Sequence, residues 1–115
     1  MSESNTIAAL KVGDEIAFGE IFKDFHEKVY FYILSKTNSS YLAAETTQLT
    51  FIKLWKYRGS LIESVPLSAQ LFRIAKTTFI DLLRMENNKS KLLNSQKYNR
   101  TYFTDIQENL ETEEL

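Results

Sequence analysis

Few side chains in this sequence are suited to covalent or acid–base chemistry. The chain has one histidine, His26, and no cysteine, so cysteine nucleophiles, thiolate metal ligands and disulfides are excluded. Two carboxylate pairs, Asp14 with Glu15 and Asp24 with Glu27, fit helix capping and solvation better than general acid–base work. No glycine-rich phosphate loop, metal-ligand spacing or catalytic triad is present. We therefore predict that the protein is not an enzyme and uses no cofactor or metal.

The basic side chains are concentrated in the middle of the chain. The net charge is only −1, but residues 53–100 carry ten basic and three acidic side chains, and residues 101–115 carry five acidic and no basic ones. A basic block favours an anionic partner, most often nucleic acid, although a solvated lysine-rich surface would have the same composition.

Aromatic residues interleave with these cations at Trp55–Arg58. Such a pattern suits single-stranded nucleic acid, because bases stack on rings and phosphates pair with cations. Core packing is the simpler interpretation for Trp55, whereas Tyr57 fits either role. The candidate nucleic-acid-binding residues are Tyr57, Arg58, Arg73, Lys76, Thr77 and Arg84.

A second candidate surface lies on the helix expected between Ser39 and Tyr57. Opposite its apolar stripe, four residues recur at i, i+3, i+4 and i+7: Glu45, Gln48, Leu49 and Ile52. Leu49 and Ile52 are apolar where solvent is expected, and an apolar patch with a polar rim is typical of a protein-binding surface. The alternative is that these two residues pack against a fourth helix.

The elements that must position these residues are helices. Apolar residues repeat at three- and four-residue steps through three segments. The first begins at the N-cap Asp14, and the second is capped by Ser39 or Ser40 and runs to about Tyr57. The third has Pro66 in its first turn, after a loop.

The predicted fold is all-α, a compact bundle of three main helices plus a weaker C-terminal helix. With three glycines and one proline the chain has few turn signals, which argues against a many-stranded β fold. We expect a flexible N-terminus over residues 1–12, one helical domain over residues 13–103 and an acidic linker or tail over residues 104–115. Asn87–Asn88 is expected to separate the third helix from the weaker one, near residues 89–103.

The compartment is predicted from what the sequence lacks. No apolar run approaches the roughly 18 residues that span a bilayer. The first residues carry no basic n-region of a signal peptide. Together with the absence of cysteine, this favours a reducing, cytoplasmic location without membrane insertion.

Three motifs in register resemble a known family. They are Phe18–Phe22 followed by Tyr30, then Ala43–Trp55, and then Leu71–Thr77 with Asp81–Arg84. In order and spacing, over about residues 14–88, they resemble region 2 of the extracytoplasmic-function (ECF) sigma factors of the sigma-70 family. The acidic tail resembles the start of the linker that leads to region 4 in that family.

The resemblance implies a transcription initiation module. Region 2 in this family docks on the clamp of the RNA polymerase β′ subunit, recognises the −10 promoter element and captures the melted non-template strand. The family's docking residues fall on Glu45, Gln48 and Leu49, where Leu49 is apolar in place of a charge. The loop over residues 58–65 corresponds to the pocket for a flipped base, and Thr77 stands where the family usually has asparagine. An anti-sigma factor is a further implied partner.

Two other interpretations stay open at this point. A sigma-like protein-interaction domain or regulator without DNA activity would keep the helical fold and the apolar patch. A helix-turn-helix protein for double-stranded DNA would need a turn of three to four residues before its recognition helix. The loop of about eight residues after Tyr57 counts against the latter.

Overall fold

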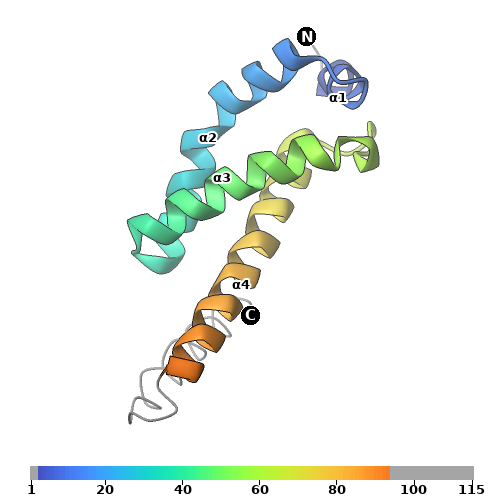
Figure 1. Ribbon diagram of the computed structural model, residues 1–115. Helices are drawn as coiled ribbons and strands as arrows, with labels where there is room; N and C mark the ends of the chain where they lie inside the picture. The colour runs from blue at the N-terminus through green and yellow to red at the C-terminus, as the bar shows by residue number, and fades with distance from the viewer. Residues whose placement is uncertain (1–2, 94–115) are drawn as a thin grey trace. The chain divides into compact units, whose positions relative to one another are not determined.

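The structure of the chain is a computed structural model that describes the backbone of residues 3–93 and the side chains of residues 5–92. This part of the chain contains no strand, and Figure 1 shows its helices. They are α1 (Glu3–Lys11), α2 (Glu15–Thr37), α3 (Ser40–Lys56), the short 3₁₀-helix η1 (Arg58–Ser60) and α4 (Leu67–Leu93). The prediction of an all-α fold is confirmed.

Contacts along the backbone divide the chain into two units, Met1–Phe79 and Ile80–Leu115. The first unit holds α1, α2, α3, η1 and the N-terminal half of α4. The second unit begins within α4. The single domain expected over residues 13–103 includes parts of both units and stays a prediction.

Helices α2 and α3 form a hairpin whose ends are fixed by polar side chains. The Asp14 carboxylate caps α2 by accepting hydrogen bonds from the N–H groups of Ile16 and Ala17, at 2.9 and 3.2 Å. The chain leaves α2 through Asn38 in the left-handed conformation, with a φ of 58°. The Ser39 hydroxyl then caps α3 by accepting from the Leu42 N–H at 3.1 Å. These caps were predicted from residue type, because oxygen side chains satisfy the free N–H groups of a first turn.

The core of the first unit combines aliphatic residues with buried threonines. Its most deeply buried side chains are Ile7, Leu10, Val29, Ile33, Leu54, Leu71, Thr46, Thr50 and Thr78. The Thr50 hydroxyl donates to the Thr46 carbonyl one turn back in α3, at 2.6 Å, which removes the cost of burying it. Helix α4 joins this core through Phe72, whose ring lies 5.3 Å from that of Tyr32.

The N-terminal residues differ from the expectation of a flexible segment over residues 1–12. Residues 3–11 form α1, and its Ile7 and Leu10 are completely buried. Helix α1 contacts both α2 and η1. The prediction was wrong because nine residues form a marginal helix on their own, and tertiary packing supplies the missing stability.

Helix α4 also differs from its prediction. It continues without interruption through Asn87–Asn88 to Leu93, so no break separates the third predicted helix from residues 89–93. Asparagine lowers helix stability by only a fraction of the cost of glycine or proline, and two asparagines do not end a long helix. The rest of the weaker C-terminal helix, residues 94–103, and the acidic segment 104–115 lie outside the described residues.

Within residues 3–93, no helix has both the length and the apolar character that crossing a membrane requires.

Candidate functional site

The patch predicted on α3 is divided between two environments. Gln48 and Ile52 are exposed, Ile52 with 51% of its surface, whereas Glu45 and Leu49 are half-buried. We expected all four side chains to be solvent-exposed, and Glu45 and Leu49 are only partly so. One turn after Leu49, the Lys53 ammonium donates to the Thr78 hydroxyl of α4 at 3.1 Å, so α4 lies along this flank of α3.

Gln48 and Ile52 border an open groove between α2 and α3. The groove consists of two adjoining hollows of about 520 and 630 Å³ that share Phe22 and Gln48. The hollow toward the α2–α3 turn also contains Phe31, and the other also contains Trp55. We call this surface the α2–α3 groove.

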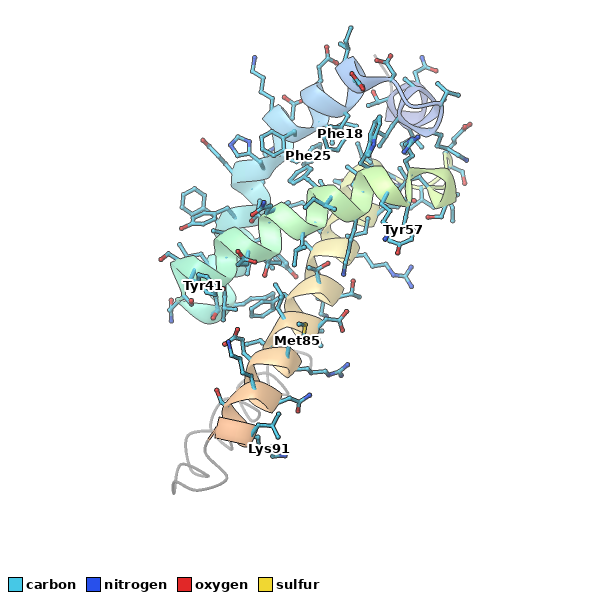
Figure 2. The ribbon with its side chains drawn as sticks, viewed as in Figure 1. Phe18, Phe25, Tyr41, Tyr57, Met85 and Lys91 are labelled. Atoms are coloured by element: carbon cyan, nitrogen blue, oxygen red, sulfur yellow. The ribbon has the colours of Figure 1, made fainter. Side chains whose placement is uncertain are left out.

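The walls of the α2–α3 groove are aromatic rings in edge-to-face contact. The Phe22 ring lies 5.0 Å from that of Phe51, and the Phe18 ring lies 5.2 Å from that of Trp55. Figure 2 shows Phe18 between the two helices. Helical periodicity assigned Phe18 and Phe22 to the core face, but Phe22 keeps 42% of its surface exposed. The spacing of apolar residues could not distinguish a groove wall from a core.

His26 has a structural role at the edge of this groove. Its ring stacks on Phe22 with centroids 4.7 Å apart, and its Nδ1 donates to the Phe22 carbonyl at 2.9 Å. His26 is therefore a half-buried helix histidine whose ring and Nδ1 are both engaged within α2. No cluster of three or more potential metal ligands occurs among the described side chains.

The outer face of α4 carries the predicted cations. Arg73 and Thr77 are exposed and Lys76 is half-buried, while Leu71 and Ala75 of the same helix are buried. The Thr77 hydroxyl donates back to the helix carbonyls of Arg73 and Ile74, at 3.1 and 3.0 Å, so only its lone pairs remain for a ligand. Arg84, also exposed, belongs to the second unit.

Tyr57 and Arg58 are neighbours in sequence but differ in their surroundings. Tyr57 ends α3 with 56% of its surface exposed, and Figure 2 shows it at that end of the helix. Its ring has the Lys56 ammonium 5.4 Å from its centroid. The Arg58 guanidinium instead lies 4.2 Å from the centroid of the Trp55 ring. Tyr57 therefore presents an open ring to solvent, whereas the Arg58 guanidinium is stacked on a ring of the protein itself.

The loop between η1 and α4 is fixed by Gln70, a residue that no sequence pattern singles out. The Gln70 side-chain amide accepts from the Ile62 N–H at 2.9 Å and donates to the carbonyls of Ile62 and Val65, at 2.8 and 2.9 Å. Three backbone groups of the loop are thus satisfied by one side chain. A glutamine eight residues away along the chain leaves no short-range pattern by which to find it.

These surfaces belong to a domain of known family. The sigma-70 region 2 family matches residues 21–89, which covers more than half of the chain. The chain therefore belongs to the sigma-70 region 2 family, a class of transcription initiation factor domains that bind RNA polymerase and take part in promoter recognition. No curated protein and no solved structure gave a significant match.

Proposed function

We propose that this domain docks on the β′ clamp of RNA polymerase through the solvent face of α3. The proposal rests on the family match together with the exposure of Gln48 and Ile52. Glu45 and Leu49 form the half-buried margin of this docking face. Covering Ile52 removes a large aliphatic side chain from water, which favours association by up to about 3 kcal/mol for a fully covered residue.

The DNA-binding surface in this proposal comprises the outer face of α4 and the end of α3. Arg73 is exposed and Lys76 is half-buried on this face, and both cations can pair with phosphates of the non-template strand. Tyr57 offers an exposed ring on which one unpaired base of the −10 element can stack. Thr77 lies on the same face of α4. Of the other two predicted residues, Arg58 stacks on Trp55 and Arg84 belongs to the second unit. The domain thereby binds the melted strand and stabilises the open promoter.

The α2–α3 groove supports a third part of the proposal, that the domain is of the ECF type and is held inactive by an anti-sigma factor. Aromatic hollows that border Gln48 and Ile52 suit an apolar partner segment. A protein seated there would cover part of the docking face and compete with polymerase.

Binding to a purified β′ clamp fragment tests the docking part of the proposal. We expect saturable binding by the wild-type chain and its loss in the variant Gln48→Arg with Ile52→Arg. Both side chains are exposed, so circular dichroism should show an unchanged helical spectrum. Equal clamp affinity of the double variant and the wild type would contradict docking through α3.

A labelled single strand containing a −10-like sequence separates this function from its alternative. A sigma-like interaction domain without DNA activity would bind the clamp and not the oligonucleotide. The exposed Arg73 and the half-buried Lys76 of α4 favour the DNA-binding function. Fluorescence anisotropy that shows clamp binding but no oligonucleotide binding, even with core polymerase present, would establish the alternative.

A further inference from the structure

The Arg58 side chain is held by the protein itself. Its Cζ atom lies 4.2 Å from the centroid of the Trp55 ring, a cation–π contact. Its Nη1 donates to the Trp55 carbonyl at 2.8 Å. Its Nε is buried and has no hydrogen-bond partner among the described residues. A guanidinium stacked on a ring and partly sealed from solvent is poorly placed to follow a phosphate backbone.

The same guanidinium lies against the turn between α1 and α2. A Cβ atom built on Gly13 would be in ordinary van der Waals contact with the Arg58 guanidinium, 3.6 Å from Nη2 and 3.8 Å from Nε, and α1 contacts η1, which begins at Arg58. Gly13 has a φ of +88°, a backbone conformation that residues other than glycine rarely adopt. Arg58 thus links this turn to the end of α3, two points that are distant in sequence.

The loop that follows Arg58 is fixed at both ends. At its far end, Gln70 binds the backbone of Ile62 and Val65. At its near end, the Leu61 N–H donates to the Arg58 carbonyl at 3.2 Å, and the Leu61 side chain is buried. Displacing Arg58 would release the near end alone, next to the exposed Tyr57 ring.

We propose that Arg58 is a positioning residue and not a DNA ligand. Its side chain packs between Trp55 and the α1–α2 turn, an arrangement that we call the Arg58 clasp. The clasp holds Tyr57 and residues 58–66 in the arrangement that receives the single strand. The part of this inference that concerns DNA binding rests on the proposed function. It also gives α1, which precedes the family match at residues 21–89, a part in DNA binding.

Two variants of Arg58 distinguish positioning from phosphate contact. Arg58→Lys keeps the charge but loses the planar stacking group, and Arg58→Met keeps an unbranched chain without charge. If Arg58 positions the loop, both variants weaken oligonucleotide binding to a similar extent. We expect the loss of this stacked cation to lower the affinity for the oligonucleotide by roughly 5–30-fold. The slope of log affinity against log salt concentration should stay at its wild-type value in both.

Direct phosphate contact gives a different pattern in the same anisotropy titrations. Arg58→Lys would then keep most of the affinity, while Arg58→Met would reduce the magnitude of the salt slope by about 0.7, the value for one phosphate of a single strand. That pattern would overturn the inference. Arg73→Met is the matched control, because this exposed arginine should lose about 0.7 of slope.

A readout that needs no DNA keeps the inference testable if the proposed function fails. Hydrogen exchange should accelerate at the amides of Ser60 and Leu61 in both Arg58 variants, with the Gln70-bound amide of Ile62 and the α2–α3 hairpin unchanged. If the wild-type chain binds no oligonucleotide, the DNA function fails, and accelerated exchange still supports the clasp. Unchanged exchange at these amides would overturn it.

Trp55→Phe provides the second variant in case Arg58 substitutions unfold the chain. Phenylalanine keeps an aromatic ring but attracts a cation less strongly than tryptophan. We expect faster exchange at the amides of Ser60 and Leu61, smaller in extent than for Arg58→Met. Exchange at the wild-type rate in a folded Trp55→Phe protein would contradict the cation–π part of the clasp.

Discussion

Helices α3 and α4 of the first unit expose surfaces of opposite character. The solvent side of α3 presents Ile52 and Gln48 beside the aromatic walls of the α2–α3 groove. The outer face of α4 presents Arg73 and Lys76. Apolar contact depends little on salt, whereas contact of cations with phosphates weakens steeply as salt rises. We therefore expect polymerase docking and DNA binding by this domain to be separable by ionic strength alone.

Ile52→Arg should have the largest effect. It removes apolar area from the docking face and forces an unpaired charge into a contact that excludes water. We expect clamp affinity to fall by about 100-fold or more, equivalent to roughly 3 kcal/mol. Isothermal titration calorimetry at two salt concentrations would measure it, with a similar loss at both.

Ile62→Arg is the matched control for that experiment, because Ile62 is similarly exposed but lies outside α3. Its clamp affinity should equal that of the wild type. Leu49→Arg, by contrast, should also lower the melting temperature, since Leu49 is half-buried. An Ile52→Arg chain that unfolds would instead identify this face as core.

Tyr57→Ala should have the second largest effect, confined to DNA. Loss of one stacking ring costs about 1–3 kcal/mol per base, or roughly 5–150-fold in affinity for the single strand. Tyr57→Phe retains the ring and should bind almost as the wild type does. Anisotropy titrations would show both, and an equal loss in the two variants would indicate that the hydroxyl and not the ring makes the contact.

Arg73→Ala combined with Lys76→Ala should change the salt dependence. Removing two phosphate contacts should reduce the magnitude of the salt slope for single-stranded DNA by about 1.4. The free energy of unfolding should change by no more than about 0.5 kcal/mol for the exposed Arg73. A wild-type slope in the double variant would exclude α4 from the DNA surface and remove the proposed contrast with α3.

Gly19→Ala should give the smallest effect and a control for all the others. Gly19 lies in α2, and a Cβ atom there meets no other atom within 4 Å. Alanine is favoured over glycine in a helix interior by about 1 kcal/mol. We expect a higher melting temperature with clamp and oligonucleotide affinities unchanged. A change in either affinity would mean that stability, and not the surfaces, limits binding.

The sequence predicted the parts of the fold that depend on neighbouring residues. The caps Asp14 and Ser39 and the start of α4 after Pro66 follow from local chemistry, and all three were located to within a residue. Helix α1 was missed because Ile7 and Leu10 find their burial in other elements. Local propensity alone cannot distinguish such a segment from a flexible terminus.

The surfaces were predictable in type and less so in detail. Residue spacing correctly placed Ile52 and Arg73 on the solvent sides of their helices. It could not show that α4 lies along the Leu49 flank, nor that Arg58 stacks on Trp55. These outcomes depend on which elements meet in space, and a periodicity of three and four residues carries no such information.

The connection between α2 and α3 has a consequence for the order of folding. Only Asn38 and Ser39 separate the two helices, so they can pair after a short loop closure. Helix α1 contacts both α2 and η1, and η1 follows the hairpin along the chain, so the packing of α1 is completed only after the hairpin has been synthesised. A substitution of Leu10 that destabilises α1 should therefore raise the unfolding rate far more than it lowers the folding rate.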